Sequence, residues 1–321
     1  MTQIRWGILG AGRIAQQFAR DIQHAPSATL SMIAARDLGR AQAFAETFNI
    51  PNAVGSYDAL YSSDQVDAIY IATPHSHHLE QGLAAITAGK AVLCEKPLSV
   101  NHADSERLIE AARDANAYLM EAMWTWFLPA IRQAEQWLND GRIGELVQVK
   151  ADFGYPMPWD PDGRAWNPDL AGGCLLDMGV YPTAFTWLFT RKPADRLSAI
   201  GRLAENGVDA DIVWQGDYGT VSASMGTSFR SKLPNLAYLI GTEGWIEIPD
   251  FWRAPQARLY KVNDLIETFV DDRAGDGFEF EIEAASQDIL AGRTQSERVS
   301  HADTLGFQIE MDRIRHAIQP R

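Results

Sequence analysis

Short apolar runs and segments of helical spacing alternate through the first 122 residues of the chain. The apolar runs have the length of buried strands, and between them apolar residues recur every three to four positions, as on one face of a helix. This alternation is typical of βαβ units and predicts a doubly wound α/β domain with a parallel sheet over residues 1–122. The predicted strands are 4–9, 29–35, 68–72, 91–94 and 117–120, and the predicted helices are 14–22, 40–48, 78–88 and 103–115.

From residue 123 the chain has the pattern of an α+β domain. A helix is followed by one longer strand and by a loop rich in Pro and Trp. From Leu197 onward, short apolar runs alternate with turn sequences such as Gly241-Thr242-Glu243-Gly244, which predicts a large, open, mostly antiparallel sheet in a second domain, residues 123–321. Its predicted helices are 130–138, 175–189, 278–290 and 302–318, and its predicted strands are 146–153, 212–215, 221–225, 236–240, 245–248 and 257–260.

Composition and charge narrow the classes of partner. The chain has 321 residues, of which 46% are hydrophobic and 22% charged, ordinary values for a folded protein of two domains. Its 28 Lys and Arg against 42 Asp and Glu give a formal charge of −14, the wrong sign for a surface that neutralises nucleic acid. A small anionic cofactor stays compatible with this charge, because salt screens a diffuse acidic field within about 10 Å.

The cysteines and the hydropathy indicate the compartment. Cys94 and Cys174 have no paired spacing, which fits a reducing compartment and provides no thiolate framework for a metal. No apolar stretch reaches the roughly 18 residues of a membrane span, and the start of the chain lacks the pattern of a signal peptide. We expect a cytoplasmic protein without a membrane partner.

A glycine-rich segment, Gly10-Ala11-Gly12-Arg13-Ile14-Ala15, follows the first predicted strand and opens the first predicted helix. It matches the G-x-G-x-x-A fingerprint, in which the glycines permit a tight turn and a close approach to pyrophosphate, and the small Ala15 lets helix and strand pack. The N-terminus of the helix offers unpaired N–H groups to phosphate. The first domain is therefore predicted to be a Rossmann domain that binds a dinucleotide at Gly10, Gly12, Arg13 and Ile14.

The end of the second predicted strand distinguishes between two cofactors. An acidic residue there binds the ribose 2′-hydroxyl of NAD, whereas an arginine can bind the 2′-phosphate of NADP. This chain has Arg36 followed by Asp37, and Asp37 also stands where it can cap the next helix. Arg36, with Arg13 and Arg40, supplies a local positive cluster. The sequence favours NADP and leaves NAD possible.

The segment 73–78 follows the third predicted strand, at the sheet edge where doubly wound domains bind ligands. It contains His75, His77 and His78, but only Glu80 is nearby to complete a ligand set, so we predict no metal site. We expect a loop beside the nicotinamide ribose, with Ser76 capping the following helix. The residues of this loop predicted to bind the cofactor are Thr73, Pro74, His75 and His78.

Glu95-Lys96-Pro97 comes directly after the predicted strand 91–94, so Lys96 would project from the end of a buried strand. Together with the glycine fingerprint and the two-part organisation, this sequence resembles the glucose-fructose oxidoreductase and inositol dehydrogenase family, Gfo/Idh/MocA, over nearly the whole chain. The segments that are similar to one branch, the dimeric dihydrodiol dehydrogenases and NADP-dependent D-xylose dehydrogenases, are 34–38, 92–97, 121–125 and 172–181.

The resemblance implies several roles. Tyr181 matches the tyrosine that acts as acid/base in this branch, Arg36 meets the 2′-phosphate, and Glu95 and Lys96 lie at the cofactor. It also implies a homodimer that forms through the C-terminal sheet. One departure concerns Trp126, where relatives often have Arg, and it puts the substrate preference in doubt.

The chemistry of the residues agrees with these roles. Oxidation of an alcohol needs a base for the hydroxyl proton, and a free tyrosine with a pKa near 10 is poorly suited to that task at neutral pH. A neighbouring ammonium would lower this pKa, so Lys96 is the predicted partner of Tyr181. Asp177 lies four positions before Tyr181 and is assigned to a substrate hydroxyl, although Pro182 predicts a helix start or a kink at Tyr181.

Aromatic residues crowd the segments expected to face the nicotinamide. Two of these residues, Trp124 and Phe127, are predicted to line the substrate pocket, because aromatic faces suit the C–H faces of sugars and cyclic diols. The other candidates are Tyr155, Trp159 and Trp166.

These features predict an NADP-dependent oxidoreductase that exchanges hydride with a carbinol or hemiacetal carbon. From the resemblance, an aldose such as D-xylose is the first substrate and a trans-dihydrodiol the second. Two alternatives stay open: an NADP(H)-binding sensor without activity, against which Lys96 and Tyr181 count, and a nicotinamide-dependent glycosidase with transient redox chemistry. Apolar residues at 245–249 and 251–252 are expected to provide surface for pairing of the open sheet.

Overall fold

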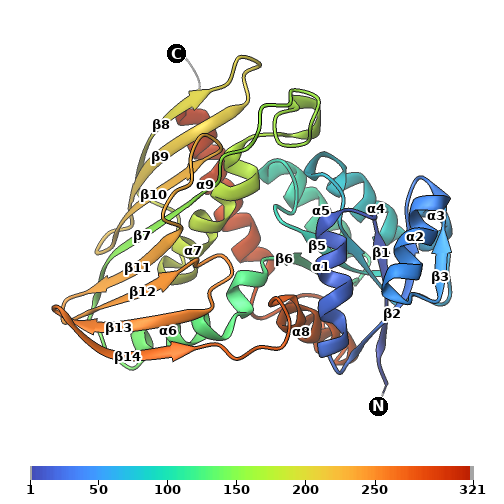
Figure 1. Ribbon diagram of the computed structural model, residues 1–321, viewed down its shortest axis with the longest axis horizontal. Coiled ribbons are helices and arrows are strands. Elements are labelled where there is room, and N and C mark those ends of the chain that lie inside the picture. The colour runs from blue at the N-terminus through green and yellow to red at the C-terminus, as the bar shows by residue number, and fades with distance from the viewer. Residues whose placement is uncertain (1, 319–321) are drawn as a thin grey trace. The chain divides into compact units, whose positions relative to one another are not determined.

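The computed structural model describes residues 2–318 and divides the chain into two compact units (Figure 1). The first unit comprises Met1–Trp124 and Arg273–Thr304, and the second comprises Thr125–Asp272 and Leu305–Arg321.

The first unit contains a six-stranded sheet in the order β3-β2-β1-β4-β5-β6, in which every neighbouring pair is parallel. The chain reverses its direction across the sheet between β1 and β4, so the crevice at the carboxyl ends of these strands is the expected ligand site of such a fold. The predicted doubly wound sheet is confirmed. The strands are β1 (Ile4–Leu9), β2 (Ala28–Ala34), β3 (Asn52–Val54), β4 (Ala68–Ile71), β5 (Ala91–Glu95) and β6 (Leu119–Ala122).

Helices of this unit follow the predicted ones closely, with one short addition. The sequence did not predict β3 or α3, because each is too short to show a hydrophobic period. The helices are α1 (Arg13–Asp21), α2 (Leu38–Phe48), α3 (Tyr57–Tyr61), α4 (His78–Thr87), α5 (His102–Asp114) and α8 (Phe278–Leu290), with short 3₁₀ segments η1 (Ile22–His24) and η2 (His75–His77).

Helix α8 belongs to the first unit, whereas the sequence pattern assigned it to the second domain. The indole of Trp6 in β1 donates to Ser286 Oγ at 2.9 Å, and the carboxylate of Asp21 accepts the N–H groups of Asp276 and Phe278 at 3.0 and 2.9 Å. These contacts satisfy the N-terminal donors of α8 and attach it to β1 and α1. The pattern along the chain cannot reveal them, because they join residues more than 250 positions apart.

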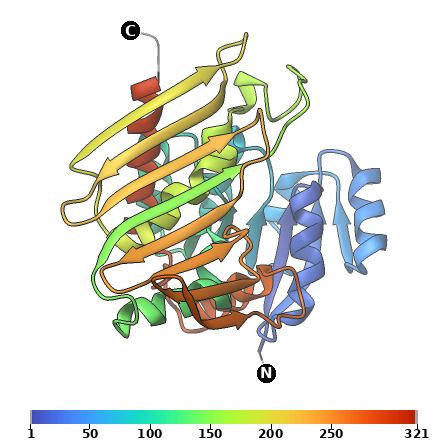
Figure 2. The same ribbon diagram turned by 60° about the vertical axis from the view of Figure 1, so that its left-hand side comes forward.

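The second unit contains an eight-stranded sheet in the order β14-β13-β12-β11-β7-β10-β9-β8, which forms one broad layer (Figure 2). Among the described strands of this second sheet, only the β7–β10 pair is parallel, so the predicted, mostly antiparallel sheet is confirmed. The strands are β7 (Leu146–Gly154), β8 (Arg196–Leu203), β9 (Asp209–Asp217), β10 (Ser222–Ser228), β11 (Leu236–Gly241), β12 (Trp245–Pro249), β13 (Gln256–Lys261) and β14 (Asp264–Val270).

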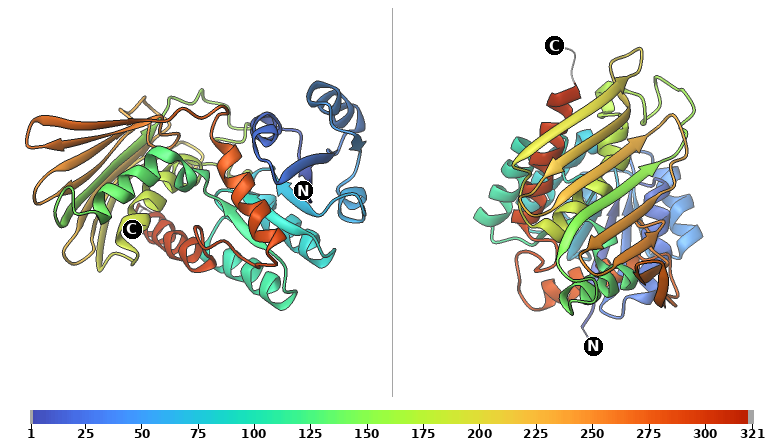
Figure 3. Two further views of the ribbon diagram at one scale, coloured as in Figure 1. Left: turned by 90° about the horizontal axis from the view of Figure 1, so that it is seen from below. Right: turned by 90° about the vertical axis from the view of Figure 1, so that its left-hand side faces the viewer.

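Helices cover one face of this sheet and leave the other face uncovered in the described part of the chain (Figure 3). Burial alternates accordingly along β9, where Ile212 and Trp214 point inward and Val213 is 56% exposed. The helical segments that lie wholly or mainly in this unit are η3 (Trp124–Phe127), α6 (Pro129–Asn139), η4 (Pro168–Leu170), the π-helical η5 (Leu175–Gly179), α7 (Val180–Thr190) and α9 (His301–Ile318).

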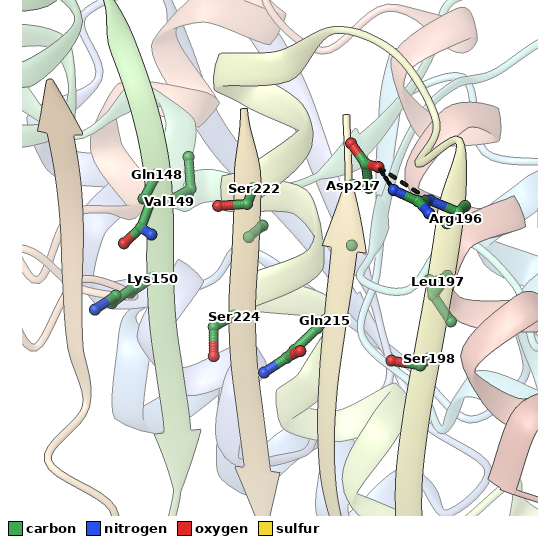
Figure 4. A pocket seen from close by; sticks show the side chains of 12 residues that line it. Gln148, Val149, Lys150, Arg196, Leu197, Ser198, Gln215, Asp217, Ser222 and Ser224 are labelled. Carbon is green, nitrogen blue, oxygen red and sulfur yellow. Dashed lines mark hydrogen bonds and ion pairs between the residues drawn. The ribbon is translucent and has the colours of Figure 1, made fainter. Parts of the chain in front are cut away.

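The uncovered face is hollowed over β7, β10, β9 and β8 (Figure 4). This hollow has a volume of about 760 Å³ and is shallow, because short serine side chains lie between longer polar ones. The serines are Ser198, Ser222 and Ser224, and the longer residues are Gln148, Lys150 and Gln215. No helix in the described range 2–318 is long and apolar enough to cross a membrane.

Candidate functional site

The glycine turn between β1 and α1 has the geometry of an anion site. Gly10 has φ +104°, and a Cβ atom there would lie 3.1 Å from the carbonyl oxygen of Ala72. Helix α1 begins at Arg13 after Gly12, with no side chain capping it and no acidic residue in its first turn. The unpaired N–H groups at this N-terminus therefore create a positive electrostatic potential, which suits a phosphate group.

Arg13 opens the helix after this turn, and two further arginines, Arg36 and Arg40, lie near Tyr57. The guanidinium of Arg40 donates to the carbonyl oxygen of Ala11 at 3.4 Å. Burial raises the pKa of the Tyr57 phenol, and the positive charges of Arg36 and Arg40 oppose that rise, so both arginines lie near Tyr57. Arg13, Arg36 and Arg40 form no ion pair within the described residues. Asp37 caps α2 and accepts the N–H of Arg40 at 2.7 Å. Its carboxylate is therefore engaged in the helix cap.

The loop after β4 carries the histidines. Thr73 Oγ1 donates to Gln81 Oε1 at 2.5 Å, and the buried His75 packs edge-to-face on His78. Ser76 does not cap α4, because the N-cap position belongs to His77. The hydroxyl of Ser76 is buried without a hydrogen-bond partner in the described part of the chain, which is the condition of a group that a ligand satisfies. No cluster of three or more His, Cys, Asp or Glu side chains in that part could hold a metal ion.

Lys96 follows β5 and is 9% exposed. The turn that carries it is held from two sides. The ring nitrogens of His78 lie 2.9 Å from the carbonyl oxygens of Pro97 and Thr73, and burial lowers the pKa of His78, so its one N–H donates to one of them. The carboxyl oxygen Oε1 of Glu121 accepts the N–H of Leu98 at 3.0 Å. Both side chains are buried, so these bonds are shielded from water. They fix the backbone on which Lys96 sits.

Buried carboxyl groups surround this turn in the first unit. Tyr70 OH donates to Glu95 Oε1. Burial raises the pKa of Glu121 to about 8, against the hydrogen bonds from Thr304 and Leu98. Burial, with the charge of Glu95, also raises the pKa of Glu281 well above its usual value. Glu121 is therefore mainly protonated at neutral pH, so it adds little negative charge near Lys96.

In the second unit, Tyr181 lies in the first turn of α7 and is 6% exposed. The predicted helix start at Tyr181 is close to the structure: α7 begins at Val180, directly after the π-helical turn η5. Pro182 is accommodated because the first N–H groups of a helix need no partner within it. The ring of Tyr181 meets Phe153 edge-on at 5.3 Å and Trp252 at 6.2 Å between ring centroids.

Asp177 lies in η5 and forms an ion pair with Arg164 at 3.0 Å. Asp177 is 14% exposed and Arg164 is 44% exposed, so the carboxylate is largely sheltered while its partner reaches solvent. The sequence did not point to Arg164, since one arginine in a polar loop gives no signal. Phe153 lies at the end of the predicted strand 146–153, and nothing in that pattern singled it out.

The aromatic residues differ in their placement. Trp124 is buried and packs on Phe278 with centroids 4.7 Å apart, and Phe127 is buried as well. Trp126 is also buried, with Phe307 and the guanidinium of Arg191 beside its ring. Its side chain is thus part of the packed interior of the second unit.

Residues 251–252 correct one expectation from the sequence. Phe251 is fully buried, and Trp252 stacks on Phe153 at 4.9 Å, so neither provides surface for pairing of the sheet. Ile246 and Ile248 are also fully buried. The apolar run 245–249 alternates along β12, and its aliphatic members face inward.

Comparisons with known proteins agree over most of the chain. The family model described as "Oxidoreductase family, NAD-binding Rossmann fold" matches residues 4–123, and "GFO/IDH/MocA C-terminal domain" matches residues 131–247. The trans-1,2-dihydrobenzene-1,2-diol dehydrogenase of Danio rerio is 35% identical over 98% of this chain and 97% of its own. That of Mus musculus is 42% identical over 78% of this chain and 75% of its own.

A solved structure is similar over nearly the full length. It is a 3-ketoreductase from Actinomadura kijaniata in complex with NADP and TDP-benzene, with 28% identity and a TM-score of 0.90. The match covers 99% of this chain and 98% of that one.

The raised pKa of Glu121 predicts a pH dependence of stability. Between the usual pKa of 4.5 and the folded value of about 8, the unfolded carboxyl is ionised and the folded one keeps its proton. The free energy of unfolding therefore falls as pH rises through this window, by up to about 1.4 kcal/mol per pH unit. Glu121→Gln removes this contribution, so its stability relative to wild type should grow from pH 5 to 8. Urea denaturation followed by tryptophan fluorescence measures the difference, and a difference that stays constant with pH contradicts the assignment.

Proposed function

The chain belongs to the Gfo/Idh/MocA family of oxidoreductases with an NAD-binding Rossmann fold, and from this premise we propose that it exchanges hydride between NADP and a CH–OH carbon of a sugar or cyclic diol. The observation that carries the proposal is the clamped, nearly buried Lys96 at the carboxyl end of β5. An ammonium held there stands at the sheet edge where a Rossmann domain binds its ligand.

The residues of the first unit fit NADP. The uncapped N-terminus of α1 suits the pyrophosphate, and the buried hydroxyl of Ser76 offers a hydrogen bond to a ligand. Arg36, assisted by Arg13 and Arg40, would hold the 2′-phosphate, because none of these arginines has an ion-pair partner within the described residues. Gly10, Gly12, Ile14, Thr73, Pro74, His75 and Glu95 would complete the cofactor site, with His78 acting through the turn that it holds.

The reaction divides between Lys96 and Tyr181. The bound nicotinamide supplies the acceptor for the hydride that leaves the carbinol carbon. Tyr181 takes the hydroxyl proton, and the ammonium of Lys96 stabilises the resulting tyrosinate. In the reverse direction Tyr181 returns the proton while Lys96 polarises the carbonyl oxygen.

Asp177 and the aromatic residues would orient the substrate. The carboxylate of Asp177 accepts a second substrate hydroxyl, and its ion pair with Arg164 holds it in position. Phe153 and Trp252 stand around Tyr181, and with Trp124 and Phe127 would provide apolar faces for the C–H groups of the substrate. An aldose such as D-xylose and a trans-dihydrodiol both offer Asp177 this second hydroxyl, and the names of the two dehydrogenase relatives favour a trans-dihydrodiol.

We further propose a cytoplasmic homodimer that forms through the uncovered face of the eight-stranded sheet. Ile200 and Val213 pair across β8 and β9 and are 77% and 56% exposed, so two apolar side chains stand together beside the polar hollow. Such a cluster is typical of an interface. Cys94 and Cys174 are buried free thiols, which fits a reducing compartment.

Removal of the Tyr181 hydroxyl tests the reaction. Tyr181→Phe should lower kcat by roughly 10²- to 10⁴-fold, the usual contribution of a general acid/base, and leave the Kd for NADPH within about twofold. Nicotinamide absorbance with a panel of aldoses and trans-diols measures the first quantity, and NADPH fluorescence measures the second. Wild-type turnover in the variant removes Tyr181 from this role. Cofactor binding without turnover by the wild-type protein on every substrate supports a sensor instead.

Arg36→Ala tests the cofactor preference. Loss of a charge-assisted hydrogen bond costs about 1.5 to 3 kcal/mol, so KM for NADP should rise by roughly 10- to 100-fold while KM for NAD changes little. Arg20→Ala is the matched control, because Arg20 lies on the exposed side of α1 and reaches Asp276 at 4.0 Å. Equal effects of Arg36→Ala on both cofactors contradict the assignment.

Light scattering tests the assembly. The wild-type protein should have twice the chain mass of 35.6 kDa at micromolar concentration, and Val213→Lys should shift it toward the single chain, because two ammonium groups would be buried without partners. Val262→Lys is the control, since Val262 lies in the turn between β13 and β14 and is 78% exposed. A single-chain mass for the wild type refutes the dimer.

A further inference from the structure

A second cavity lies in the second unit, apart from Tyr181. It has a volume of about 440 Å³ and is formed by the loop after β7, the end of β8 and the start of β9. Its lining combines two indoles with arginine, glutamate and small apolar side chains. These residues are Trp159, Trp166, Arg202, Leu203, Ala204, Glu205, Ala210 and Arg230.

The loop anchors one of the two indoles, that of Trp166. Trp166 is 5% exposed, its Nε1 donates to Pro158 O at 2.9 Å, and its carbonyl oxygen accepts from Asn206 Nδ2 at 2.6 Å. Phe229 meets the ring of Trp166 edge-on at 5.2 Å. Trp159 leans on Trp166 with centroids 5.0 Å apart, yet is 50% exposed. An indole that stays half exposed while its neighbour is anchored offers a preformed apolar face to a ligand.

The charged groups of the cavity are balanced. The Nη1 atom of Arg230 lies 3.9 Å from Oδ2 of Asp211. Arg202 and Glu205 both line the cavity. The side chains of Arg202 and Glu205 have no hydrogen bond or ion pair within the described residues. They are therefore available as one donor group and one acceptor group, without the net positive charge that a phosphate needs.

This combination matches a neutral saccharide ring. The indole face of Trp159 suits the C–H face of a pyranose, and Arg202 and Glu205 can bond to neighbouring hydroxyls as donor and acceptor. A bare aromatic ring would bury these two charged groups without pairing them, which is unfavourable. Pockets that hold small ligands begin at about 300 Å³, so the volume is sufficient for one sugar ring.

The same loop connects this cavity with the proposed substrate site. Arg164, two positions before Trp166, forms the ion pair with Asp177, whereas Trp159 and Trp166 line the cavity. We propose that the cavity is a subsite for a second sugar ring, so that the chain acts on a disaccharide or glycoside whose first ring is oxidised at Tyr181. This inference rests on the proposed function and specifies that the substrate has a second sugar ring.

The test compares substrates of different length. With the wild-type protein and NADP, kcat/KM for xylobiose, cellobiose or maltose should exceed that for xylose or glucose by at least tenfold for one linkage. Trp159→Ala and, independently, Arg202→Ala should lower that ratio by tenfold or more. Trp245→Ala is the control, because Trp245 is an aromatic residue on β12 that stacks on Tyr260, outside the cavity; it should leave the ratio unchanged.

A binding measurement separates this inference from the proposed reaction. In the Tyr181→Phe protein, titration with the preferred disaccharide should still change the tryptophan fluorescence, and Trp159→Ala should abolish that change. Saccharide binding without any turnover by the wild type would overturn the proposed reaction and keep the subsite. Equal kcat/KM for all monosaccharides and disaccharides, or a ratio that Trp159→Ala does not alter, would overturn the subsite.

Discussion

The hydrogen bonds that hold the turn after β5 are the constraint on which the proposed chemistry depends. Backbone groups buried away from water must be paired. Here Glu121 accepts the N–H of Leu98, and a ring nitrogen of His78 lies within hydrogen-bond distance of the carbonyl oxygen of Pro97. Because α4 and β6 each supply one partner, the turn cannot shift without breaking a buried bond. The ammonium of Lys96 thus projects from a backbone that is fixed before any ligand binds, so little ordering cost is left for the reaction.

This constraint also shows how far the sequence predicts the site. The strand that leads to Glu95 could be predicted from the sequence, because buried parallel strands are continuous apolar runs. The glycine turn after β1 could be predicted because its fingerprint has a fixed spacing. The part played by His78 was not readable in this way. The sequence placed it among residues beside the cofactor, whereas both ring nitrogens face backbone carbonyl oxygens. A contact between residues 19 positions apart depends on strand order, which a hydrophobic pattern does not contain.

The same reasoning explains which parts of the fold escaped prediction. Periodicity gave the bounds of β1 and α8 as the structure has them, yet it could not assign α8 to a unit, since the bonds of Asp21 and Trp6 to α8 are long-range. Hydrophobicity alone made Trp252 a candidate for a paired surface. In the structure it stacks on Phe153 beside Tyr181, because a residue just beyond a strand end can turn inward. Side-chain direction there is decided by tertiary packing.

The arginines near the glycine turn and two arginines of the second unit differ in whether a carboxylate pairs with them. The chain carries a net charge of −14, yet Arg13, Arg36 and Arg40 around the glycine turn keep their charges without ion-pair partners in the described residues. Two arginines of the second unit lie beside carboxylates instead, Arg164 beside Asp177 and Arg230 beside Asp211. Uncompensated positive charge suits a cofactor with phosphate groups, and compensated charge suits neutral hydroxyls, because a paired carboxylate stays ionised and can still accept a hydrogen bond. The unpaired arginines near the glycine turn thus suit an anion, and the paired Arg164 and Arg230 suit a neutral polyol.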